Sequence, residues 1–94
     1  MILEIVTPEA ILYKGKVSTI TLPGAKGSFQ ILKNHAPIVA LLDKGTICFT
    51  ESETPKVFAQ EYFTQSQATK GERSLVISEG VVEQKENKII VLAQ

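Results

Sequence analysis

The sequence contains few of the residues on which catalysis and metal binding usually depend. It has no tryptophan, one histidine (His35) and one cysteine (Cys48). A single cysteine cannot form an internal disulfide, so we expect a reducing compartment. A single histidine with no cysteine nearby offers no metal-ligand spacing, which argues against a zinc site. We therefore expect no metal, no cofactor and no catalytic residue in this chain.

The two single residues fit structural or contact roles better than catalytic ones. His35 lies among turn-forming residues, where a histidine usually caps backbone groups or lies at the surface, so we do not interpret it as a general base. Cys48 lies between Ile47 and Phe49 in an alternating segment, so it points to the opposite face from both. No histidine is near in the sequence to activate it, and we interpret it as a small packing residue.

Long apolar runs and clusters of one charge are also missing. The longest apolar runs, Ile38–Leu42 and Ile89–Ala93, are far shorter than the roughly 20 residues that cross a bilayer, so no direct membrane insertion is expected. The N-terminus carries Glu4 and lacks the basic start of a secretory signal. Ten basic residues balance ten acidic ones without a basic run, which argues against nucleic acid as a partner.

What the sequence does contain indicates one small globular domain. Its 94 residues are 44% hydrophobic and 21% charged, a balance typical of folded proteins. The expected domain spans residues 1–94, with 51–74 as a variable hairpin or loop extension. The acidic residues of that extension are interpreted as solvated surface. They are Glu51, Glu53, Glu61 and Glu72.

Short strand patterns and turn signals recur along the whole chain, and no stretch has a long helical pattern. The predicted strands are 2–6, 10–13, 17–22, 28–31, 38–42, 46–50, 57–64, 75–77, 80–82 and 88–92. The predicted turns are Lys14–Lys16, Gly24–Gly27, Lys33–Pro37, Asp43–Gly45 and Lys85–Asn87. This spacing predicts an all-β fold, an antiparallel sandwich or barrel.

Two of these strands carry a more specific expectation. Ile38–Leu42 is a continuous apolar run, too short for a helix, so we predict a strand buried on both faces. Val57–Thr64 is predicted as a strand, although Phe58 and Tyr62 also have helical spacing there.

Three stretches resemble a known family. They are LEIVTPE, LPGAKGSFQILKNHAPIVALLDKGTI and ISEGVVEQKENKIIVLA, which together cover roughly residues 1–49 and 75–93. The order and spacing of PG, GSF, NHAP and KG, followed by a glycine before a valine-rich closing hairpin, resemble the epsilon subunit of bacterial F-type ATP synthase. The equivalent mitochondrial subunit is called delta.

The resemblance implies a fold and a role. The fold is an antiparallel β-sandwich of about ten short strands, here without the C-terminal helical domain that family members commonly have. The role is that of a non-catalytic rotor subunit in the central stalk, which binds the gamma subunit and the c ring and couples proton translocation to ATP synthesis. Such a subunit is peripheral, lies at the cytoplasmic face of the cell inner membrane, and is monomeric when isolated.

The resemblance also implies two sets of contact residues. The gamma contacts are Thr7, Ile38, Ala40 and Leu42. The c-ring contacts are Lys26, Ser28, Lys33 and His35. The loop Gly24–Ser28 and the corner Asn34–His35 are implied to lie together at the membrane-facing end of the sandwich, over the polar loops of the c ring.

Two other classes of function stay open. A free-standing β-sandwich module for a peptide or a sugar requires a concave pocket with aromatic platforms, yet Tyr13 and Tyr62 are the only tyrosines and tryptophan is absent. A small enzyme requires at least two convergent polar groups with perturbed ionisation.

Overall fold

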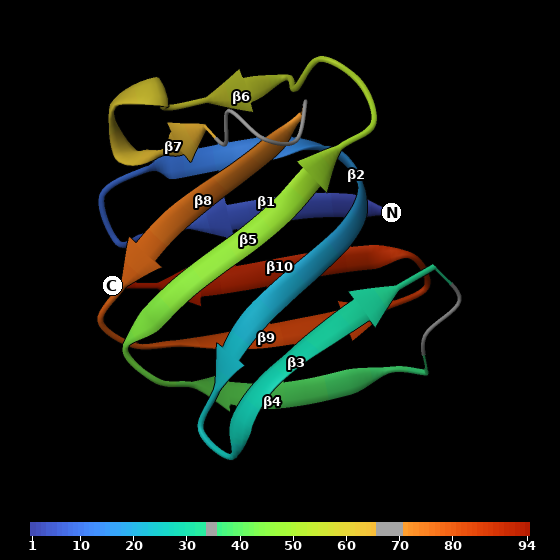
Figure 1. Cartoon of the computed structure of the whole chain (residues 1–94), viewed down its shortest axis with the longest axis vertical. Helices are drawn as coiled ribbons and strands as arrows, with labels where there is room; N and C mark the ends of the chain where they lie inside the picture. The colour runs from blue at the N-terminus through green and yellow to red at the C-terminus, as the bar shows by residue number, and fades with distance from the viewer. Residues whose placement is uncertain (34–35, 66–70) are drawn as a thin grey trace.

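The structure is a computed structural model that describes residues 1–33, 36–65 and 71–94 (Figure 1). Its strands are β1 (Ile2–Val6), β2 (Ile11–Gly24), β3 (Gly27–Leu32), β4 (Ile38–Leu42), β5 (Gly45–Glu51), β6 (Val57–Phe58), β7 (Thr64–Gln65), β8 (Glu72–Ile77), β9 (Gly80–Lys85) and β10 (Lys88–Ala93). A single 3₁₀ turn, η1 (Gln60–Tyr62), is the one helical element among the described residues. The prediction of an all-β fold with about ten short strands is therefore confirmed.

The strands form two layers that pack face to face. The first layer has the order β1, β10, β9, β4, and the second has the order β3, β2, β5, β8, β7. In Figure 1 the strands of the two layers cross at an oblique angle. The long strand β2 belongs to both layers, because its first half pairs with β1 and its second half with β3 and β5. The pair β1 and β10 is parallel, and the other pairs of the described strands are antiparallel.

The core lies between the layers and is built by alternation along each strand. In β10, for example, Ile89 and Val91 are buried while Leu92 is exposed. Each fully buried aliphatic side chain contributes about 1.5–3 kcal/mol to the stability of the fold. The buried hydrophobic residues are Leu3, Ile5, Leu12, Tyr13, Val17, Ile20, Leu22, Ile31, Leu42, Ile47, Phe49, Leu75, Ile77, Val82, Ile89, Val91 and Ala93.

Strand β4 is buried on one face, so the prediction that Ile38–Leu42 is buried on both faces is wrong. Val39 and Leu41 are 74% and 67% exposed. Ile38 and Ala40 are partly buried and pack against the core cluster. The apolar run is explained by an outer face that is itself apolar and that no described part of the chain covers.

Strand β2 continues through the predicted turn at Lys14–Lys16, so that prediction is also wrong. Residues 14–16 are part of the strand and pair with β1. Gly15 has a different purpose: a Cβ on it would lie 2.9 Å from Pro55 Cβ and 3.0 Å from the Tyr13 hydroxyl. The missing side chain leaves room for the segment around Pro55 to cross the strand closely.

The turns predicted at Gly24–Gly27 and Lys85–Asn87 are confirmed. Gly24 pairs with Gly27 at the end of the β2–β3 hairpin, and Gly27 has a φ of 120°, which favours glycine. The β9–β10 hairpin turns at Glu86 and Asn87, whose φ values of 50° and 67° fit a type I′ turn.

The predicted strand Val57–Thr64 is instead two short strands separated by η1. Its two phenylalanines both turn toward one aromatic cluster. The ring of Tyr13 lies 4.6 Å from Phe49, 6.1 Å from Phe58 and 5.9 Å from Phe63, between ring centroids. A continuous strand would not place Phe58 and Phe63 on the same side, since they are an odd number of residues apart. Burial of both rings therefore accounts for the break.

Glu51 is held in a polar network beside this cluster, so its prediction as solvated surface is wrong. The Tyr13 hydroxyl donates to Glu51 Oε2 at 2.8 Å, and Arg73 Nε donates to Glu51 Oε1 at 2.8 Å. The Glu51 side chain is 10% exposed. The Arg73 guanidinium also lies 4.2 Å from the centroid of the Phe58 ring, a cation–π contact.

Replacing Tyr13 with phenylalanine is expected to reduce the loss of stability at alkaline pH. Burial, then the hydrogen bond to Glu51, raises the pKa of Tyr13 above its ordinary value. The unfolded chain releases this proton near pH 10, whereas the folded chain keeps it. The stabilisation that the protonated Tyr13 side chain contributes is therefore complete below about pH 10. Above that pH it is lost by about 1.4 kcal/mol per pH unit.

Urea unfolding of both proteins between about pH 8 and pH 11 measures this difference. The phenylalanine variant loses the hydrogen bond to Glu51 at every pH, so the informative quantity is the slope of the unfolding free energy against pH. Equal slopes for the two proteins above pH 10 would contradict the expectation.

Candidate functional site

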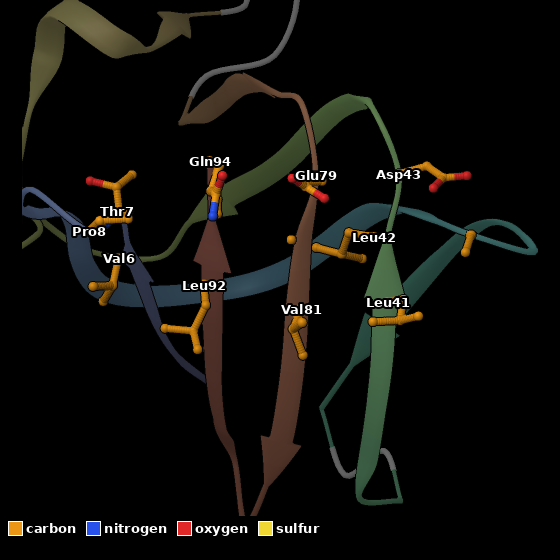
Figure 2. A pocket seen from close by; sticks show the side chains of 13 residues that line it. Val6, Thr7, Pro8, Leu41, Leu42, Asp43, Glu79, Val81, Leu92 and Gln94 are labelled. Carbon is orange, nitrogen blue, oxygen red and sulfur yellow. The ribbon is translucent and has the colours of Figure 1, made fainter.

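The outer face of the first layer presents a continuous line of apolar side chains. The register pairs Val6 with Leu92, Leu92 with Val81, and Val81 with Leu41, so the line crosses all four strands. Figure 2 shows these side chains next to one another, from Val6 at one side to Leu41 at the other. Leu41 and Leu92 are 67% and 55% exposed. We call these four side chains the apolar row.

A hollow of about 650 Å³ is lined by the apolar row and by the neighbouring ends of the strands. Thr7 and Pro8, in the loop after β1, lie at one side of it, and Asp43 and Glu79 lie at the other (Figure 2). Gly80 lies in the floor, where a Cβ would be 2.6 Å from the Leu92 carbonyl oxygen. The hollow thus has an apolar floor and a polar rim with two carboxylates.

The outer face of the second layer is polar in comparison. The register there places Thr21 beside Cys48 and Cys48 beside Ser74. Cys48 is half-buried, while Ile47 and Phe49 are buried, which confirms that Cys48 faces the opposite side. Burial, and secondly the charge of Glu72, raises the pKa of the Cys48 thiol. A raised pKa disfavours the thiolate, so this face does not carry an activated nucleophile at Cys48.

The predicted gamma contacts do not all lie on one exposed surface, although Thr7 and Leu42 both line the hollow. Thr7 lies at the rim of the hollow, where its hydroxyl donates to the Ala10 carbonyl at 3.2 Å. Leu42 is 3% exposed, and Ile38 and Ala40 face inward against the core. The side chains of β4 that face outward are Val39 and Leu41. The two-residue period of a strand separates the two sets in the sequence, because it places positions 39 and 41 on one face and positions 38, 40 and 42 on the other.

Three of the predicted c-ring contacts, Lys26, Ser28 and Lys33, lie along β3 or just beyond its ends. Lys26 and Ser28 are exposed in the β2–β3 hairpin, and Lys33 is exposed just beyond the other end of β3. Lys26 and Lys33 are therefore up to about 23 Å apart, at 3.3 Å per residue of strand. The expectation that the loop Gly24–Ser28 and the corner Asn34–His35 lie together stays a prediction, because Asn34 and His35 lie outside the described residues.

The described residues contain neither a cluster of metal-ligating side chains nor a membrane-spanning helix. Within residues 1–33, 36–65 and 71–94, no three acidic, histidine or cysteine side chains are grouped so that they could hold a metal ion. In the same ranges, no helix has both the length and the apolar character needed to span a bilayer.

A β-sandwich with an exposed apolar sheet face is typical of a domain that packs against another protein. A family model described as "ATP synthase, Delta/Epsilon chain, beta-sandwich domain" matches residues 1–94. The chain belongs to this family. The resemblance of its three sequence stretches to the epsilon subunit is thereby confirmed.

Individual relatives agree with the family match. The ATP synthase epsilon chain of Sulfurimonas denitrificans is 34% identical over 92 residues, which are 98% of this chain and 58% of the relative. That of Desulfatibacillum aliphaticivorans is 37% identical over 94 residues, which are 100% of this chain and 55% of the relative. The chain thus spans little more than half the length of these curated relatives.

A solved structure shows the same fold. It is a chain from the cryo-EM structure of the central stalk and c ring of Tetrahymena thermophila mitochondrial ATP synthase, with a TM-score of 0.65 and 16% sequence identity. The match covers 100% of this chain and 63% of that chain.

Proposed function

We propose that this chain is a non-catalytic central-stalk subunit of an F-type ATP synthase. In this role it binds the gamma subunit and the c ring, turns with them, and couples proton translocation to the ATP synthesis that other subunits catalyse. As part of that complex it lies at the cytoplasmic face of the cell inner membrane. The family match and the names of the relatives support the proposal, and residues 51–74 form its variable extension.

The apolar row is the observation that carries this proposal. Apolar surface left in water costs about 25 cal/mol per Å², and contiguous patches of this kind usually mark a contact with a partner. We assign the gamma contact to the apolar row and to Thr7 at the rim of the hollow. The predicted contacts Ile38, Ala40 and Leu42 then act by holding β4 in place against the core.

The β2–β3 hairpin is assigned to the c ring, with Lys26 and Ser28 exposed near its tip. Its Gly24–Gly27 turn is tight, so it loses little conformational entropy when it docks. Lys33 and His35 stay predicted c-ring contacts. Exposed lysines of this kind contribute about 0.2–1 kcal/mol per ion pair, so they orient the contact more than they stabilise it.

Backbone hydrogen bonds join the two proposed contact regions directly. The Ala25 amide donates to the Leu41 carbonyl at 3.0 Å, and the Asp43 amide donates to the Pro23 carbonyl at 2.8 Å. The hairpin that we assign to the c ring is therefore bonded to the strand that carries Leu41. A subunit that transmits rotation needs such a stiff connection, because a flexible linker between the contacts would absorb the torque.

The hollow does not favour a sugar- or peptide-binding module. The residues that line it are Val6, Thr7, Pro8, Ala25, Leu41, Leu42, Asp43, Glu79, Gly80, Val81, Leu92, Ala93 and Gln94. Among these described residues there is no aromatic ring, whereas sugar recognition relies on aromatic platforms.

The proposal is tested by binding to the gamma subunit and to the c ring of the same organism. We expect a complex with gamma, and titration calorimetry measures its affinity. The interface is expected to bury roughly 1,600 Å² in total. With a Ser28→Cys change in a Cys48→Ser background, oxidation of the assembled complex is expected to crosslink this subunit to cysteines in the c-ring loops. Absence of gamma binding would contradict the proposal. Gamma binding without any c-ring crosslink would contradict only the assignment of the hairpin.

A further inference from the structure

Acidic side chains border the apolar row on both sides. Two positions from Val81 lie Glu83 on β9 and Glu79 just before β9, both exposed. The same two-residue step leads from Leu41 to Asp43, just after β4, and from Val6 to Glu4 on β1. The acidic residues that border the row are Glu4, Glu83, Asp43 and Glu79. Of these four, Glu4 forms an ion pair among the described residues, with Lys88 Nζ at 4.0 Å from its Oε2.

The spacing of the apolar row fits a helix that lies across the strands. Neighbouring strands are about 4.8 Å apart, so the row is about 14 Å long between its outer strands. One turn of an α-helix rises 5.4 Å, so contact residues three or four positions apart match successive strands, and about ten to twelve residues cover the row. The acidic borders lie about 7 Å to each side, within reach of long basic side chains on the flanks of such a helix.

The sheet face offers no backbone partner to an extended segment. The amides and carbonyls of β10 and β9 are already used in pairing with β1, with each other and with β4. An extended segment laid on this face would leave its own amides and carbonyls unpaired when it buried them, which costs free energy. A helix satisfies its own backbone internally and does not meet this cost.

A second copy of the chain does not complement this face. In a two-fold pair that stacks one apolar row on the other, each acidic border faces an acidic border of the second copy. Like charges in such a contact repel one another and oppose association. A partner with basic borders removes this repulsion.

We infer that the element of the gamma subunit that covers the apolar row is an amphipathic helix crossing β1, β10, β9 and β4, with basic side chains on both flanks. This inference rests on the proposed function, since it specifies which part of that partner binds. The helix places one apolar side chain over each strand and its lysine or arginine side chains over the acidic borders.

Site-specific crosslinking tests the geometry. A benzophenone amino acid is placed in turn at Val6, Leu92, Val81 and Leu41, and each complex with gamma is irradiated and mapped by mass spectrometry. We expect the four crosslinked positions to lie within about twelve residues of gamma, in the order of the strands and three or four residues apart. Crosslinks spread over separate segments, or made to a second copy of this chain, would overturn the inference.

Charge reversal tests the basic flanks. The double change E79K/E83K is expected to weaken gamma binding at least tenfold at low salt and to reduce the dependence of Kd on salt. The matched control E53K/E61K reverses two exposed acids outside the face and is expected to change Kd less than twofold. Unchanged binding by E79K/E83K would overturn the inference while the proposed function stands. A wild-type chain that fails to bind gamma would overturn both.

Discussion

Replacing Leu92 with glutamate is expected to weaken gamma binding about a hundredfold, close to 3 kcal/mol. Leu92 lies within the apolar row, between Val6 and Val81, and is 55% exposed. The glutamate would be desolvated in the complex without a partner, and it would stand between two acidic borders that already repel it. Calorimetry with purified gamma measures the loss.

A matched control is available on the other layer. Val76 is 71% exposed and faces outward from β8 in the second layer, so Val76→Glu adds the same charge to an apolar surface position outside the apolar row. We expect this variant to bind gamma within about threefold of the wild type, which is less than 1 kcal/mol. If Leu92→Glu binds as tightly as Val76→Glu, the apolar row is not the gamma contact. Both variants should keep the wild-type unfolding midpoint within a few degrees, because both positions are exposed.

Replacing Phe49 with alanine is expected to cost about 3–5 kcal/mol of folding free energy. Phe49 is 1% exposed, and its ring centroid lies 4.6 Å from that of Tyr13 and 5.9 Å from that of Phe63. The change leaves a cavity where β2, β5 and the segment after β6 meet. Since a domain of this size has a total stability on the order of 5–15 kcal/mol, the melting temperature should fall by about 12 °C or more.

Phe63→Ala is the comparison for this variant, because Phe63 belongs to the same cluster but is only partly buried. We expect it to cost clearly less than Phe49→Ala, about 1–2 kcal/mol. Calorimetric unfolding at neutral pH gives both values. Equal costs would mean that the segment after β6 contributes as much to the core as β5 does, contrary to the burial of the two rings.

Much of the fold could be predicted because it depends on residues that are close in the sequence. The alternation of Ile47, Cys48 and Phe49 is a property of one strand, and the structure places the three as that pattern predicts. The turn at Gly24–Gly27 depends on four residues and their φ values. The resemblance of three stretches to one family identified the sandwich before any contact was known.

The candidate site could be predicted in part. The resemblance implies a gamma contact at Thr7, which lies at the rim of the hollow. For β4 the resemblance implies Ile38, Ala40 and Leu42, although Val39 and Leu41 are the side chains that face outward. A period of two separates these sets, but it does not say which set faces the core.

Local patterns and the family resemblance in the sequence predict the fold class, the family, most of the strands and the residues that share a face within each strand. Long-range packing determines which face of β4 is buried, that β2 runs unbroken through Gly15, and that Glu51 lies in a network with Tyr13 and Arg73. The apolar row also depends on packing between distant segments. Val6 and Leu92 are neighbours because β1 and β10 pair in a particular register, and that register is set by packing between segments that are far apart in the chain.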